Sequence, residues 1–418
     1  MLRVLKGNIL FAPAFGSLEV IDHGCIVLQD GKITGLFKEL PERFQSAESD
    51  DFGDALIVPS FCDMHLHAPQ YPMLGMGMDL PLLDWLNTYT FKTESRFADP
   101  EYARKIYHEF VQKLIDGGTT RVCMFSSLHT DATGILMEEL EQAGLCGYVG
   151  KVSMDRNSPD YYSETTEESK RETLRWLKES ERFQNIRPIL TPRFTPSCSD
   201  DLMAWLGDLA KERNLPVQSH LSENRGEIAW VKELHPDCER YWETYHKYGL
   251  WKNGTLMAHC VYSDETERKA MRDYGVTAVH CADSNINIAS GLAPVRQMLS
   301  EGVPVVLGSD IAGGAQLNML DVIQMTIRMS KIKRIESGWT TDFLTVAEAF
   351  YLGTSAGAEY FGDRPGFVPG QSLHAVVLDD SAFTETKNLT LKERFERAVY
   401  LCKPQQIKAV YGNGKRIK

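Results

Sequence analysis

Residues 58–70 read VPSFCDMHLHAPQ, where an apolar run ends in two histidines one residue apart, His65 and His67. Side chains on an extended strand alternate with a period of two, so both imidazoles are expected to leave the same face. Two neutral imidazoles on one face can bind a zinc or iron ion. Alone the pair is weak evidence, because one histidine of such a pair can equally bond to a neighbouring group. The metal-site hypothesis therefore requires further ligands elsewhere in the chain.

The composition is typical of a globular enzyme with one large domain and an accessory domain. The 418 residues are 43% hydrophobic and 24% charged, and the formal net charge is −12. An acidic chain without a run of lysine and arginine is not expected to bind nucleic acid. Nine cysteines without a C-x-x-C pair favour reduced thiols over a disulfide framework. We see no signal peptide and no apolar run of about 20 residues, and therefore expect a cytoplasmic protein that makes no use of a membrane.

The two ends of the chain read as short strands. Asp30-Gly31 lies between two β-rich runs and predicts a hairpin, residues 372–378 resemble a strand, and Asn413-Gly414 indicates another hairpin. We expect residues 1–58 and 366–418 to form one small β-sandwich domain beside a catalytic domain of residues 59–365. Two unrelated terminal extensions are the alternative.

The central residues alternate between strand-like and helix-like segments. The eight candidate strands end near His65, Ser126, Met154, Phe194, His220, His259, Ala282 and Asp310. The expected helices cover residues 100–116, 131–143, 165–183, 200–213, 226–234, 264–274, 292–300 and 317–331. This alternation predicts an α/β fold of the TIM type, a (β/α)8 barrel whose active site lies at the carboxyl ends of the strands. A doubly wound open sheet is the alternative, but no glycine-rich phosphate loop follows an early strand.

Candidate site residues fall at these strand ends. His220 and Glu223 follow the fifth strand, His259 ends the sixth, and Asp310 ends the eighth. In a barrel they would converge on one axis and could share a metal ion with the two histidines of the first strand. Each also has an ordinary interpretation, as a histidine satisfied in the core or an aspartate that caps the next helix. Their joint occurrence at strand ends favours the metal site.

The pattern H-x-H, H-x-x-E, a later lone histidine and S-D resembles the metal-dependent amidohydrolase superfamily. Within it, the chain is similar to the guanine deaminases over nearly its whole length. The segments that carry this similarity are HAPQY (67–71), DLPLLDWLNTYTF (79–91), PRF (192–194), SCS (197–199), HLSEN (220–224) and SDIAGG (309–314). Residues 282–283 (AD) and 315–318 (AQLN) depart from the family pattern and leave the exact base preference open.

The resemblance implies a ligand set of His65, His67, His220 and Asp310 for one zinc ion, although iron tolerates the same set. Some relatives bridge two metals with a lysine on the fourth strand. That strand reads RPILTPRF here and offers no lysine, so a single ion is expected.

The resemblance also implies hydrolysis of guanine at C2 to xanthine and ammonia, with water as the second substrate. Glu223 would carry a proton to ring N3 and then to the departing amine. His259 would hydrogen-bond the attacking hydroxide, and Asp310 would accept a proton in addition to binding the metal.

The same resemblance implies how the base is bound. Arg193 would donate to O6 of guanine, and the Gln70 amide can both donate and accept. Phe194 and Trp85 would give flat apolar cover. Relatives of this kind are commonly dimers, so a homodimer is implied here.

Two alternatives stay open. Another amidohydrolase that acts on 8-oxoguanine, an adenosine-type nucleoside, cytosine or a triazine would share the metal set, and a non-catalytic scaffold protein is the further alternative. Deaminases with H-x-E and P-C-x-x-C signatures belong to a different fold. The chain lacks that signature.

Overall fold

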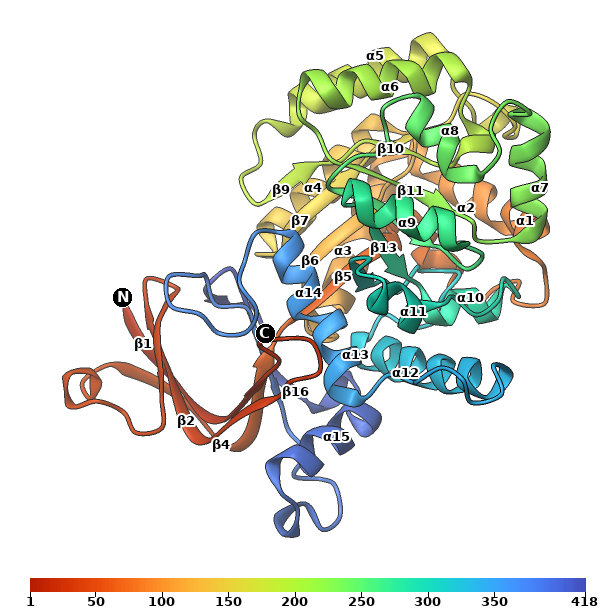
Figure 1. Cartoon of the computed structure of the whole chain (residues 1–418). Coiled ribbons are helices and arrows are strands. Elements are labelled where there is room, and N and C mark those ends of the chain that lie inside the picture. Colours follow the sequence, from red (N-terminus) through yellow and green to blue (C-terminus); the bar gives the residue numbers. More distant parts are fainter.

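The computed structural model describes residues 1–418, with the exception of the side chain of Lys387. A barrel of parallel strands surrounded by helices lies beside a curved sheet that the two ends of the chain build together (Figure 1). The predicted fold class is confirmed. None of the helices described is both long enough and apolar enough to cross a membrane.

The barrel strands are β5 (Phe61–His67), β6 (Thr119–Phe125), β7 (Cys146–Gly150), β9 (Ile186–Pro188), β11 (Val217–Leu221), β12 (Thr255–His259), β13 (Thr277–His280) and β14 (Val305–Leu307). They pair in the orders β5-β6-β7-β9 and β11-β12-β13-β14. The two halves meet where Leu190 bridges Val217. On the other side, the Asp310 N–H donates to the His65 carbonyl at 2.8 Å.

Two of the predicted strands are interrupted. The third continues as β8 (Val152–Ser153) and the fourth as β10 (Thr191–Pro192), and these two short strands pair with each other. In the fourth strand the cause lies in Pro188 and Pro192, because proline has no N–H to donate to a sheet. The break shifts the end of this strand but leaves the following residues at the mouth of the barrel.

The eight predicted helices are present with small shifts at their ends. They are α3 (Pro100–Asp116), α4 (Thr130–Gln142), α5 (Thr166–Ser180), α6 (Asp200–Glu212), α7 (Arg225–Leu234), α9 (Glu265–Tyr274), α11 (Val295–Ser300) and α12 (Met319–Glu336). Asp99 caps α3, since its carboxylate accepts from the N–H groups of Glu101 and Tyr102.

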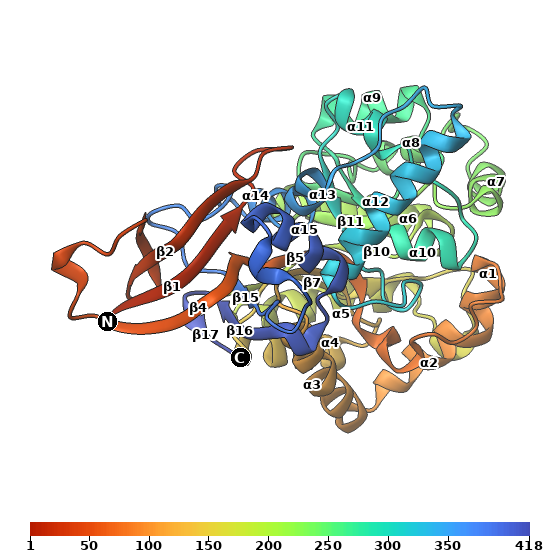
Figure 2. The same ribbon diagram turned by 90° about the horizontal axis from the view of Figure 1, so that it is seen from below.

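Further helices were not predicted. They are α1 (Leu82–Trp85), α2 (Phe91–Ser95), α8 (Tyr241–Lys247), α10 (Ala282–Asn287), α13 (Val346–Gly353), α14 (Ser355–Tyr360) and α15 (Leu391–Leu401). Most are too short to show a periodic apolar face. Figure 2 shows α15 where the terminal sheet meets the barrel. There Phe395 packs edge-on against Phe350 of α13, and Arg394 donates to the Asp54 carbonyl.

The terminal segments form one seven-stranded sheet in the order β17-β16-β15-β4-β1-β2-β3. Its strands are β1 (Leu2–Phe11), β2 (Glu19–Gln29), β3 (Lys32–Phe37), β4 (Glu48–Pro59), β15 (Ala375–Leu378), β16 (Ile407–Gly412) and β17 (Lys415–Arg416). Both predicted hairpins are confirmed. Asp30, Gly31, Asn413 and Gly414 have φ values of 51°, 80°, 47° and 79°, as a two-residue type I′ turn requires.

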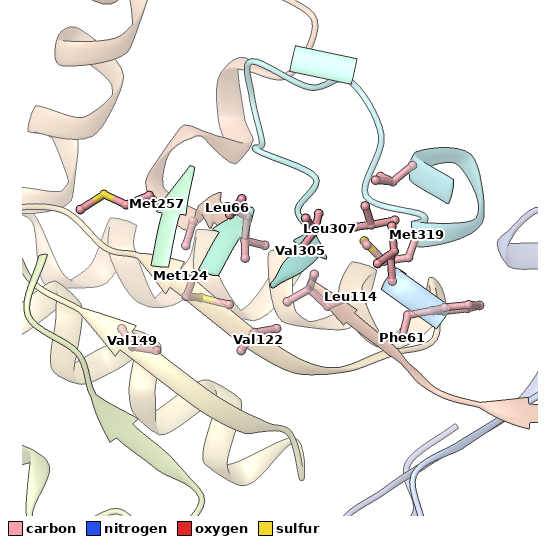
Figure 3. Packing of buried hydrophobic residues seen from close by; sticks show 14 of the residues in the cluster. Phe61, Leu66, Leu114, Val122, Met124, Val149, Met257, Val305, Leu307 and Met319 are labelled. Atoms are coloured by element: carbon pink, nitrogen blue, oxygen red, sulfur yellow. The ribbon is translucent and has the colours of Figure 1, made fainter. Parts of the chain in front are cut away.

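Buried side chains of the barrel strands alternate between two cores. One core lies between strands and helices, where Leu66, Val122 and Met124 pack near Leu114 of α3 (Figure 3). The other fills the barrel with residues that, apart from the irregular end of β5, have the opposite parity: Cys62, Met64, Cys123, Ile189, Leu256, Ala258, Val279, Cys281 and Val306. In the regular parts of the strands, the period of two therefore tells which residues face the barrel axis.

Candidate active site

The first strand turns its two histidines inward through an irregularity. Cys62 and Met64 lie in the barrel interior, so a regular strand would send His65 and His67 outward to the helices. The pairing of β5 with β6 shifts register between Asp63 and Leu66, and Leu66 lies in the outer core instead. Both histidines consequently face the axis, with ring centroids 5.0 Å apart. The prediction that they share a face is confirmed, but the bulge decides which face.

The predicted metal donors converge at the carboxyl ends of the strands. The ligand nitrogens of His65, His67 and His220 lie within 4.8 Å of one another. The Nε2 atoms of His67 and His220 are 3.2 Å apart, and Oδ1 of Asp310 lies 3.2 Å from His65 Nε2 and 3.7 Å from His67 Nε2. All four side chains are largely buried. The structure thus brings together residues from β5, β11 and the loop after β14.

The protonation of this cluster suits a cation. Burial lowers the pKa of His65 and lowers the pKa values of His67 and His220 well below the ordinary range. The Nδ1 of His220 lies 2.6 Å from the Arg193 carbonyl, which can only accept, so the lone pair of His220 is at Nε2. It faces the Nε2 of His67, and the buried Nε2 of His65 has no hydrogen-bond partner. Lone pairs that face one another are satisfied by a metal ion.

Asp310 is the anionic member of the cluster. Burial alone would raise its pKa, but the His65 imidazole, whose Nε2 lies 3.2 Å from Oδ1, and the other surrounding imidazoles hold the pKa well below its usual value. Cys281 also lies close to His65, His259 and Asp310. Burial raises the pKa of the Cys281 thiol well above its usual value, so it remains a neutral group whose Sγ points to the Val279 carbonyl at 3.6 Å. The candidate donor set is therefore three imidazoles and one carboxylate.

Glu223 and His259 stand beside this cluster. Nε2 of His259 lies 3.6 Å from Oε2 of Glu223 and 3.7 Å from Oδ2 of Asp310. Burial, reinforced by the negative charge of Asp310, raises the pKa of Glu223 well above its usual value. The Nδ1 of His259 lies 2.9 Å from Oδ1 of Asn285, which fixes the orientation of the ring. A carboxyl group with a raised pKa and a carboxyl group with a lowered pKa therefore both lie within 4 Å of the His259 ring nitrogen.

A cavity of about 430 Å³ opens over the cluster. Its lining residues include the four substrate-binding candidates, Gln70, Trp85, Arg193 and Phe194, together with His67, His220, Glu223, His259 and Asp310. Further apolar walls come from Leu82, Leu86 and Ile288. Every predicted site residue except His65 lines this one cavity, and Nε2 of His65 lies 3.2 Å from Oδ1 of the lining residue Asp310.

Comparison with known proteins gives the family of the chain. A family model described as "Amidohydrolase family" matches residues 56–416. The chain belongs to this family. A protein of Rattus norvegicus named guanine deaminase is 38% identical, over 99% of this chain and 96% of that protein. Among solved structures, a guanine deaminase from C. acetobutylicum with bound guanine in the active site is 42% identical, with a TM-score of 0.98 over 100% of both chains. The E. coli guanine deaminase structure is 30% identical, with a TM-score of 0.92 over 100% of this chain and 99% of that one.

Sequence reasoning missed several residues that hold this amidohydrolase site in place. Asp63 accepts from the Ser309 N–H at 2.9 Å and from its hydroxyl at 2.5 Å, which ties the loop of Asp310 to the first strand. Asn285 orients His259, and Glu94 binds Arg193 and Gln70. A buried arginine requires an anionic partner, so Arg193 was a signal that such a carboxylate exists. Nothing in the sequence indicated which one.

Proposed function

We propose that the chain catalyses the hydrolytic deamination of guanine at C2 to xanthine and ammonia. The observation that carries this proposal is the composition of one cavity. Its lining combines metal-type donors and Glu223, whose pKa is raised, with Arg193, Gln70 and Phe194, which suit a planar base with a polar edge. The full-length similarity to relatives that are named guanine deaminases supports the same substrate.

His65, His67, His220 and Asp310 would hold one zinc ion. Three neutral imidazoles and one carboxylate match the donors that zinc prefers, and iron accepts the same set. A bound zinc ion lowers the pKa of a water molecule and so supplies a hydroxide at neutral pH.

The protein residues would manage the protons of the reaction. The water oxygen forms a bond to C2 of guanine, and the bond from C2 to the amino nitrogen breaks. Water gives up two protons, which in the net reaction appear on ring N3 and on the departing ammonia. Glu223 would give the proton of its carboxyl group to N3, take up one proton of the attacking water and pass it to the amino nitrogen. Asp310 would accept the second proton of the water and return it to Glu223 at the end of the cycle. His259, oriented by Asn285, would hydrogen-bond the attacking oxygen through Nε2.

The base would be recognised by its O6 edge and its flat faces. Arg193 offers charge-assisted donors to O6, and the Gln70 amide lies beside it. Phe194 and Trp85 supply apolar surface that excludes water from the bound base.

Turnover of guanine by the metal-replete chain tests the proposal, with xanthine followed by its absorbance and ammonia measured in a coupled assay. Rapid release of both products in equal amounts is the expected result. If the chain binds one equivalent of metal but leaves guanine unchanged, the proposal that guanine is its substrate is refuted. Another amidohydrolase reaction would then be the remaining alternative. Metal analysis of the purified chain separates zinc from iron, and sedimentation tests the homodimer that we also propose.

A further inference from the structure

We propose that Glu94 determines base specificity as a positioning residue, because it orients the two side chains that meet the O6 edge of the substrate. The inference rests on the proposed function and extends it to a residue outside the motifs that carried the family resemblance. Among the residues described, Gln70 and Arg193 line the cavity and Glu94 does not. Glu94 therefore acts through these two neighbours.

The Glu94 carboxylate is fully buried and accepts four hydrogen bonds. Arg193 donates from Nη1 to Oε2 at 2.6 Å and from Nη2 to Oε1 at 3.1 Å. Gln70 donates from Nε2 to Oε1 at 2.8 Å, and the Tyr162 hydroxyl donates to Oε2 at 2.8 Å. Each carboxylate oxygen thus accepts two bonds. A buried arginine of this kind is held in one plane by its bidentate partner.

This arrangement decides which polar groups face the base. The Gln70 amide is fixed at both ends, since Nε2 donates to Glu94 and Oε1 accepts from the Ala312 N–H at 3.1 Å. Arg193 has donors only. The N–H groups that remain on these two side chains would therefore present a donor edge to the base. A donor edge pairs with the O6 acceptor of guanine and rejects a purine with an amino group at that position.

Glu94 also links this edge to the apolar wall of the cavity. It lies on α2, at the end of the segment that supplies Leu82 and Trp85 to the cavity. The guanidinium carbon of Arg193 lies 5.2 Å from the ring centroid of Phe91, at the start of the same helix. One buried ion pair between α2 and the residue after β10 consequently sets the positions of both the donors and the apolar wall.

The test compares Glu94→Gln with a matched control, Glu164→Gln. Glu164 also forms a buried ion pair, with Lys151 at 2.8 and 2.9 Å, but neither residue lines the cavity. Each variant is assayed with guanine and with 2-aminopurine, which lacks O6, as a competitive inhibitor. Glu94→Gln should lower kcat/KM for guanine about 100-fold and change the inhibition constant of 2-aminopurine less than about 3-fold. Glu164→Gln should lower thermal stability and leave the ratio of the two constants unchanged.

Equal losses for guanine and 2-aminopurine in Glu94→Gln would refute the inference, because a purely structural role affects both ligands alike. If Glu94→Gln does not fold, Tyr162→Phe removes one of the four bonds to the carboxylate and should shift the ratio in the same direction, by about 10-fold or less. An unchanged ratio in that variant would equally refute it. Wild-type protein that turns over no guanine would refute the proposed function and this inference with it, whereas an active wild type with an unshifted ratio in the variants refutes the inference alone.

Discussion

Replacement of Glu223 by glutamine should remove turnover and leave the metal site intact. Glutamine has nearly the same shape, and its carbonyl can still accept the Ser290 hydroxyl bond, which is 3.5 Å long in the native chain. The side chain lies 3.6 Å from His259 Nε2, where an amide remains a polar neighbour. The amide carries no proton that it can transfer at neutral pH. The substitution therefore removes the chemistry at this position while most of the packing is kept.

The expected loss follows from the two proton transfers assigned to Glu223. General acid–base catalysis by one group contributes about 10²- to 10⁴-fold. Because the same carboxyl serves both N3 and the leaving amine, kcat should fall by at least about 10³-fold. The free energy of unfolding should change by no more than about 1 kcal/mol, since the Ser290 bond is kept. The measurements are ammonia release, metal content per chain and the thermal unfolding midpoint.

Glu227→Gln serves as the matched control one helical turn further along the chain. Glu227 is also buried, but its carboxylate accepts from the N–H groups of Glu223 and Asn224 and from the Tyr241 hydroxyl. Glutamine cannot accept all three bonds in the same way, so stability should fall by about 1–3 kcal/mol with a smaller loss of kcat than in Glu223→Gln. Full activity of Glu223→Gln would refute the proton-carrier role. Loss of metal together with activity would show that Glu223 supports the metal site instead.

Three further outcomes are expected. Removal of the metal by a chelator should abolish activity and lower the unfolding temperature, and added zinc should restore both; unchanged stability of the chelated chain would contradict the proposed site. Gly314→Ala should lower kcat and destabilise the fold by about 2 kcal/mol, because its Cβ would lie 2.0 Å from the Ser309 carbonyl oxygen, whereas Gly134→Ala, with no atom within 4 Å, should be tolerated. Burial raises the pKa of Glu267 to about 7 from an ordinary 4.5, so its contribution to stability is complete below pH 4.5 and is lost as the pH rises to 7 and above. Glu267→Gln should remove about 3 kcal/mol of that pH dependence in denaturation curves, and exposed Glu265→Gln should leave it unchanged.

Much of the architecture could be predicted because local chemistry and global topology agree. The hairpins at Asp30-Gly31 and Asn413-Gly414 follow from a turn that needs positive φ at both residues. The candidate metal residues could be grouped because polar side chains at the carboxyl ends of barrel strands converge on one axis, whereas their roles and the substrate-binding residues came from the family resemblance. Pro188 and Pro192 also indicate an interruption of the fourth strand, which the prediction of one continuous strand did not include.

The supporting residues were harder to predict because their partners are distant in sequence. Glu94 meets Arg193 across 99 positions, and Asp63 meets Ser309 across 246. No local sequence pattern distinguishes a carboxylate that forms a buried ion pair from a carboxylate on the solvent-exposed face of a helix. By contrast, α13 begins with a capping box of Thr345 and Glu348, a local signal that the sequence displays. The residues that support the site could not be predicted because their partners are distant in sequence. The helix α13 could have been predicted from its local capping signal.

The orientation of the site histidines shows why convergence of strand ends is not sufficient. Met257 packs outward against the helices, so His259, two residues later, would point outward on a regular strand. His259 instead has φ of 71°, in the left-handed region that non-glycine residues seldom adopt, and its ring enters the cavity. Asp310, in the loop after β14, has φ of 49°. Such conformations cost about 1–3 kcal/mol each.

These costs are offset by the contacts that hold each residue in place. Asn285 holds the His259 ring, and the Asp63–Ser309 bonds hold the backbone next to Asp310. The sequence signals a left-handed residue mainly through glycine or asparagine, and here the positions carry histidine and aspartate because the site needs their side chains. A period-of-two pattern therefore predicts which residues reach the mouth of this barrel. The bulge in β5 and the left-handed residues after it decide which of them face one another, and both depend on contacts between segments that only the folded chain brings together.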